Sequence, residues 1–244
     1  MSHSRLNQVT DAHTANSRWN GLYKTGGATA VIMVVCIPIT IFFYIASPPP
    51  ETVIEHFTLF QSNRLLGLLG MDLLYLLSNV VAIPMYLAFY IALRRVSESS
   101  MLIATTLGLV AVVALFAARP AFDMLVLSDQ YAAATTDAQR GVLLAAGEAM
   151  LAIFNGTAFQ VHYVLGSISL LMISVVMLRS DVFSKPTAYV GIVASVTGLG
   201  LYVPTIGVSI SILSVVGLWI WYILIARRFF QLGQRVSKEE VSRN

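Results

Sequence analysis

Two sets of polar residues occur inside long apolar stretches of this 244-residue sequence. The first set has an acid, an amide and three tyrosines at intervals that place them on one face of a helix: Asp72, Tyr75, Asn79, Tyr86 and Tyr90. Asp72 is the one acidic residue well inside an apolar stretch, where an ionised group is costly. The pattern predicts a proton, cation or ligand site, or else a structural carboxyl bonded to a neighbouring helix.

The second set recurs at intervals of seven residues and consists of Glu148, Asn155, His162 and Ser169. Because histidine titrates near neutral pH, one hypothesis is a proton relay between His162 and either Glu148 or Asp72. The other is a histidine that packs between two helices. The candidate residues for a ligand or proton site are therefore Asp72, Tyr75, Asn79, Glu148, Asn155 and His162.

Sequence motifs of hydrolytic or nucleotide chemistry do not occur. There is no His-Glu-x-x-His, no Gly-x-Ser-x-Gly and no Gly-rich phosphate loop. Of the four histidines, only His162 falls in an apolar stretch, and Cys36 is the single cysteine. A haem or a multi-ligand metal site in the bilayer therefore lacks its ligands. We expect no catalytic residue, no metal and no cofactor.

The composition indicates an integral membrane protein. Apolar residues make up 57% of the chain and charged residues 11%, with a mean hydropathy of +0.77. We expect an all-α, polytopic bundle of six transmembrane helices, since each apolar stretch is long enough to cross a bilayer. The stretches are 28–46, 65–93, 101–118, 158–178, 187–208 and 210–226. The second is longer than a bilayer requires, and a tilt or a kink at Pro84 would absorb the excess.

The regions between and around these stretches complete the expected organisation. A polar segment 1–27 precedes the transmembrane domain 28–228, and a charged tail 229–244 follows it. Within the second outer loop, Thr136 and Gln139 have the spacing of a capping box, which predicts an extracytoplasmic amphipathic helix near 137–154. A break near Asn155 should separate this helix from the next span.

Basic residues predict the orientation. With both termini in the cytoplasm, twelve Lys and Arg residues lie inside and three outside, namely Arg64, Arg119 and Arg140. We therefore expect a cell inner membrane protein with both termini cytoplasmic. The basic pI near 9.1 does not indicate nucleic-acid binding, because the basic residues flank apolar stretches and form no patch of their own.

Several short motifs resemble a known family. The segment 131–149 reads YAAATTDAQRGVLLAAGEA, and it is accompanied by DLLY at 72–75, YVGI at 189–192 and LWIW at 218–221. Together they resemble a bacterial membrane family catalogued as domain of unknown function 4386, over about residues 15–232. The resemblance implies a six-span fold with no assigned activity, and it adds no catalytic residue.

The function expected from these observations is non-enzymatic. We expect a bilayer-embedded protein that binds a small or lipidic ligand or a membrane-protein partner. One alternative is a proton-linked small-solute transporter that uses Asp72 and His162. A third hypothesis is a membrane-embedded lipid-modifying enzyme, with Glu148 and His162 as acid and base.

Overall fold

The computed structural model describes residues 19–241, except for the side chains of residue 208 and of residues 235–241. Most of the polar segment 1–27 and part of the tail 229–244 therefore lie outside the described residues. Contacts divide the chain into two compact units. Unit 1 consists of Met1–Val34, Val81–Thr106 and Ile168–Asn244, and unit 2 consists of Val35–Val80 and Leu107–Ser167.

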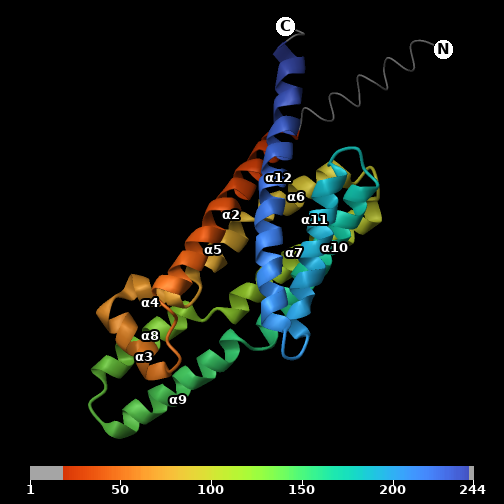
Figure 1. Ribbon diagram of the computed structural model, residues 1–244. Coiled ribbons are helices and arrows are strands. Elements are labelled where there is room, and N and C mark those ends of the chain that lie inside the picture. Colours follow the sequence, from red (N-terminus) through yellow and green to blue (C-terminus); the bar gives the residue numbers. More distant parts are fainter. Residues whose placement is uncertain (1–18, 242–244) are drawn as a thin grey trace, which may run out of the picture. The chain divides into compact units, whose positions relative to one another are not determined.

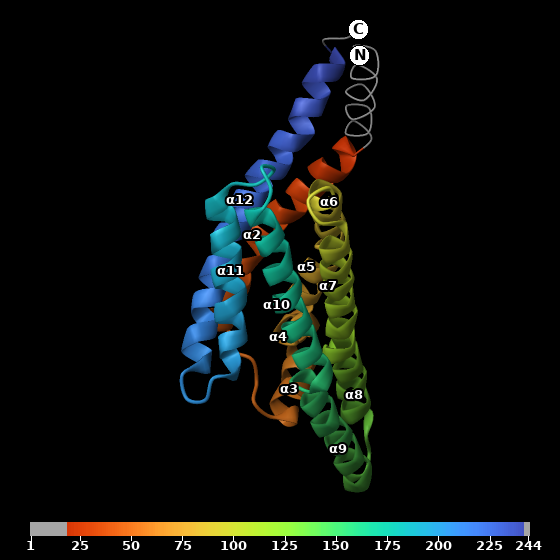
Figure 2. The same cartoon turned by 90° about the vertical axis from the view of Figure 1, so that its right-hand side faces the viewer.

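The described residues form helices and no strand (Figures 1 and 2). In chain order these are α2 (Asn20–Ala46), α3 (Val53–Ser62), α4 (Arg64–Gly70), α5 (Leu73–Val81), α6 (Ile83–Leu93), α7 (Glu98–Ala118), α8 (Ala121–Ala133), α9 (Asp137–Phe154), α10 (Thr157–Leu178), α11 (Lys185–Leu199), the 3₁₀ turn η1 (Gly200–Tyr202) and α12 (Gly207–Val241).

Five helical segments of the described chain are long and apolar enough to cross a membrane. They are Asn20–Ala46, Leu73–Leu93, Glu98–Ala133, Asp137–Leu178 and Ser209–Gln234. These segments support an all-α polytopic membrane protein. The remaining expected span, 187–208, overlaps α11, which has only 15 residues and is too short to be counted as a crossing. Six spans are therefore not confirmed.

The stretch 65–93 is not one long helix, as its hydropathy suggested. Asn63 caps α4 by accepting a hydrogen bond from the backbone N–H of Leu66, and α4 ends at Gly70. A second interruption falls at Ala82, two residues before Pro84, because proline lacks a backbone N–H and is tolerated in a first helical turn. Asp72 therefore lies at a helix break and does not share one continuous helical face with the tyrosines that follow it, although its spacing predicted that it would.

Helix α9 begins at Asp137, where the capping pattern places a helix start. The Thr136 side chain accepts from the backbone N–H of Gln139 at 3.2 Å, whereas Gln139 Oε1 accepts from Thr135 N at 3.1 Å and not from Thr136. The predicted break is also present, since α9 ends at Phe154 and α10 begins at Thr157. The heptad set from Glu148 to Ser169 is consequently divided between two helices.

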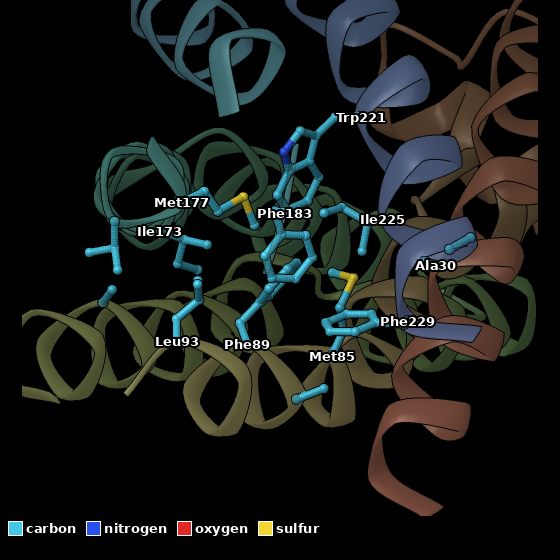
Figure 3. Packing of buried hydrophobic residues seen from close by; sticks show 14 of the residues in the cluster. Ala30, Met85, Phe89, Leu93, Ile173, Met177, Phe183, Trp221, Ile225 and Phe229 are labelled. Carbon is cyan, nitrogen blue, oxygen red and sulfur yellow. The ribbon is translucent and has the colours of Figure 1, made fainter. Parts of the chain in front are cut away.

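The core of unit 1 centres on a cluster of apolar and aromatic side chains (Figure 3), and the polar residues buried in the described part of this unit are uncharged serines and threonines. Phe89 lies at its centre, with ring centroids 5.0 Å from Phe229, 5.3 Å from Trp221 and 5.9 Å from Phe183. Phe183 and Phe229 meet nearly edge to face, at 82°. These rings come from α6, the turn before α11, and α12, so aromatic packing holds unit 1 together.

Candidate functional site

Asp72 occupies the break between α4 and α5 in a left-handed backbone conformation, with φ of 61°. Aspartate tolerates this conformation better than most side chains do. Its backbone N–H donates to Leu69 O at 3.1 Å, and its carbonyl accepts from Leu76 N at 2.9 Å. The backbone N–H and C=O of Asp72 therefore remain hydrogen-bonded at the break. The carboxylate lies beside the N-terminal end of α5, where negative charge is favoured.

The Asp72 carboxylate is buried with a partner on each oxygen. Its Oδ2 lies 2.9 Å from Arg119 Nε, and the side chains of Asp72 and Arg119 are only 9% and 3% exposed. The Tyr44 hydroxyl donates to Oδ1. Charges removed from water are stable only when paired in this way. With Tyr44, which is 37% exposed, the buried ion pair forms a network of three groups, which we call the Asp72 network.

Arg119 also binds the carbonyl ends of two helices. It directly follows α7, and its Nη1 donates to Phe154 O of α9 at 2.7 Å and to Ala118 O of α7 at 3.3 Å. Helix C-terminal carbonyls lack intrahelical partners and carry partial negative charge. The guanidinium carbon lies 4.1 Å from the Phe154 ring centroid and 4.6 Å from that of Phe159, within range of cation–π attraction.

His162 of α10 and Tyr75 of α5 form a second polar contact. His162 Nδ1 lies 2.8 Å from Ala111 O, and its Nε2 lies 2.8 Å from the Tyr75 hydroxyl. A carbonyl can only accept, so Nδ1 must carry a proton. In the neutral ring Nε2 then accepts from Tyr75, which assigns the tautomer from the hydrogen-bond network. The Tyr75 ring centroid is 6.0 Å from the Arg119 guanidinium, so this pair adjoins the Asp72 network.

Three of the six predicted site residues, Asp72, Tyr75 and His162, come together in unit 2. Asn79 lies one turn from Tyr75 and donates to its carbonyl at 3.0 Å, a local bond. Glu148 and Asn155 are exposed, on α9 and at its C-terminal cap. No contact between Glu148 and His162 is found among the described residues, so the predicted stripe does not form one surface.

The sequence patterns gave no indication of Arg119 or Tyr44 as site residues. Arg119 was expected in an outer loop, yet it is 7% exposed and pairs with Asp72. The one available signal was its position, directly after the apolar stretch 101–118 and before Pro120, with no polar residue in between. Tyr44 sits near the C-terminal end of α2 and carried no signal beyond its residue type.

The chemistry open to this site is proton exchange and recognition of a charged group. A carboxylate, an imidazole and a guanidinium are buried here, beside the half-buried phenol of Tyr75 and the exposed phenol of Tyr44. Within residues 19–241, no group of three or more His, Cys, Asp or Glu side chains is placed to hold a metal ion.

Comparison with protein families identifies the chain. The model of the domain of unknown function DUF4386 matches residues 25–230, which include all of the site residues. No curated protein and no solved structure matches. The matched region covers most of the 244 residues, so this membrane protein belongs to the DUF4386 family.

Proposed function

We propose that this protein transports a small solute together with protons and that Asp72 is the proton-binding group. The observation that carries the proposal is the buried Asp72–Arg119 ion pair. An ionisable residue inside a membrane protein is costly and generally marks an ion, proton or substrate pathway. Apolar packing would hold the helices at lower cost, as it does in the core of unit 1.

The contacts of Arg119 favour exchange of a proton on Asp72. When Asp72 is protonated, Arg119 loses its anionic partner but keeps the carbonyls of Phe154 and Ala118. Because the guanidinium stays hydrogen-bonded in both states, the energy difference between them is reduced. The neutral His162–Tyr75 pair provides a second titratable group close by.

Interrupted helices surround these groups, as in many secondary transporters whose sites lie at helix breaks. Breaks occur between α4 and α5, between α7 and α8, and between α9 and α10. Non-helical backbone at membrane depth is tolerated where protein or a wet cavity covers it. The breaks are therefore suitable places for the backbone changes that alternating access requires.

The topology that we propose has six crossings, with both termini in the cytoplasm of a bacterial inner membrane. Helix α11 and η1 together supply the crossing expected at 187–208, since 15 α-helical and three 3₁₀ residues span about 28 Å. Basic residues on the cytoplasmic side support this orientation. Cysteine labelling from either side, at positions introduced in the loops of a Cys36→Ser chain, tests it.

The transport experiment uses the full chain in proteoliposomes loaded with a pH-sensitive dye. A panel of monocarboxylates, amino acids, sugars and monovalent cations is added outside, and internal pH is followed. We expect one class to drive proton entry, and Asp72→Asn to abolish that entry while the protein stays folded. Asp129→Asn is the matched control, because Asp129 is a half-exposed carboxylate in the same unit. Loss of folding in Asp72→Asn would instead support a structural role.

Ligand binding without transport is the second candidate, supported by the aromatic rings beside Arg119. Phe154 and Phe159 are suited to the apolar part of an acidic lipid or small amphiphile. This candidate predicts a co-purifying acidic ligand, lost in Arg119→Gln, and no solute-driven proton entry. The lipid-modifying enzyme has no geometric support, since Glu148 is exposed and shares no described contact with His162.

A further inference from the structure

We infer that the solute is a small carboxylate anion and that Arg119 binds it when Asp72 takes up a proton; this inference rests on the proposed proton-linked transport. The two oxygens of Asp72 already have separate partners, Tyr44 on Oδ1 and Arg119 on Oδ2. A proton on Oδ2 would displace Arg119 while the bond from Tyr44 to Oδ1 remains. Protonation of Asp72 therefore frees one edge of the Arg119 guanidinium, while the hydrogen bond between Tyr44 and Asp72 is kept.

The free edge has the geometry that carboxylates prefer. Arginine has five N–H donors, and its Nε and Nη2 edge binds a carboxylate with two parallel bonds. In Arg119, Nε lies 2.9 Å from Asp72 Oδ2 but makes no hydrogen bond, and Nη1 donates to two backbone carbonyls. No acceptor for Nη2 is found among the described residues. Asp72 thus balances the charge of this edge but accepts a hydrogen bond from neither of its donors, and a carboxylate ligand would accept from both.

Charge balance selects an anion over other solutes. The resting site holds one carboxylate and one guanidinium, with no net charge. Uptake of one proton forms one O–H bond on Asp72 and leaves Arg119 as an unpaired buried cation, which is unfavourable. One monovalent anion then restores neutrality, so a proton and an anion enter together and leave together. A cationic solute would add charge to the same site.

Within the described part of the chain, no second carboxylate contacts Asp72 or Arg119. The titratable side chains that face Asp72 or lie beside Arg119 are those of Tyr44, Tyr75 and His162, with Tyr163 next to Phe159. Phe154 and Phe159 cover the guanidinium with apolar surface. The site therefore suits a carboxylate with a small apolar body.

The test measures acetate and benzoate binding to the purified full chain in detergent, with proton uptake followed in weakly buffered solution. We expect affinity to rise as pH falls, with about one proton taken up per anion bound. Because an amide side chain mimics the protonated acid, Asp72→Asn should bind the anions about tenfold more tightly at neutral pH and without proton uptake. Arg119→Gln should bind neither anion, and Asp129→Asn should match the unmodified protein.

The double variant Asp72→Asn with Arg119→Gln is the control for misfolding, because it removes both charges and leaves no unpaired charge buried. It should fold and bind no anion. The inference is overturned if Asp72→Asn weakens anion binding, if Arg119→Gln leaves it unchanged, or if proton-linked flux is driven only by cations or neutral solutes. The last outcome would leave the proposed transport intact. Anion binding without any proton-linked flux would overturn the proposed transport and, with it, this inference.

Discussion

Each unit of this protein has an apolar cluster, but among the described residues only unit 2 also buries an ion pair. Unit 1 fills its core with Phe89, Phe183, Trp221 and Phe229, and unit 2 buries Asp72 with Arg119. Both arrangements join several helices, but only the second requires charges to leave water. Unit 1 shows that this chain can hold membrane helices together by apolar contact. This contrast is the reason for proposing that the ion pair of unit 2 has a function.

The largest expected effect comes from removing the cation of unit 2. Arg119→Ala should lower the free energy of unfolding by about 3–5 kcal/mol, because it leaves a buried carboxylate without its counter-ion. Adding Asp72→Asn to this variant should recover part of the loss. Titration with a denaturing detergent measures both. If the double variant were as unstable as Arg119→Ala, the two charges would not be coupled and the contrast between the units would fail.

A tight contact in unit 1 gives the next largest effect. A Cβ on Gly191 would overlap Ser174 Oγ and lie 2.7 Å from Trp221 Nε1, both of which are buried. Gly191→Ala should therefore cost about 1–3 kcal/mol through overpacking. Proton-linked flux per folded molecule should stay unchanged, since the substitution disturbs only side-chain packing in unit 1.

The matched control for that substitution is Gly141→Ala in α9, where a Cβ meets nothing within 4 Å. It should be neutral or stabilise the helix by up to about 1 kcal/mol. Equal losses of thermal stability in the two alanine variants would show that close packing at Gly191 is not what holds unit 1.

His56 in α3 makes a smaller, pH-dependent contribution to the free energy of unfolding of unit 2. Burial lowers the pKa of His56, and a hydrogen bond to the Pro50 backbone and the Glu55 charge oppose this only in part. The folded protein therefore binds a proton there less readily than the unfolded chain does. Stability should fall as pH drops below the ordinary histidine value of about 6.5, until the lower folded pKa is passed. Thermal unfolding at several pH values should show this slope, and His56→Gln should remove it.

The smallest effect is expected at the exposed ion pair of the same unit. Arg64 Nη2 lies 3.0 Å from Asp129 Oδ1, but the side chains are 68% and 50% exposed. Asp129→Asn should change the free energy of unfolding by less than about 1 kcal/mol, since solvent screens such pairs. A loss comparable with that of Arg119→Ala would show that burial does not distinguish the two pairs.

Local features of the fold could be predicted from the sequence because their signals are local. The capping pattern at Thr136 placed the start of α9, and the Asn155–Gly156 pair indicated the break before α10. The break at Asp72 was hidden, because leucines on both sides keep hydropathy continuous across it. Gly67 and Gly70 were its only cues, and isolated glycines inside an apolar helix are a weak signal.

The site was predictable only in part, for a different physical reason. Asp72 and His162 stood out because polar groups are rare in apolar stretches. Their partners are determined by tertiary packing. Arg119 directly follows an apolar stretch, and this position in the sequence is equally consistent with an exposed loop residue and with a buried one. Glu148 was a misleading candidate because a seven-residue spacing implies one face only when the helix is continuous, and here it is not.

The central claim is that the buried Asp72 accepts a proton while it keeps its hydrogen bond from Tyr44. Infrared difference spectra of the reconstituted protein, recorded between neutral and acidic pH, test it directly through the carbonyl band of a protonated buried carboxyl. We expect this band to appear on acidification in the unmodified protein and in Asp129→Asn, and to be missing in Asp72→Asn. The same band in all three proteins would contradict the account, because the proton would then reside on another group.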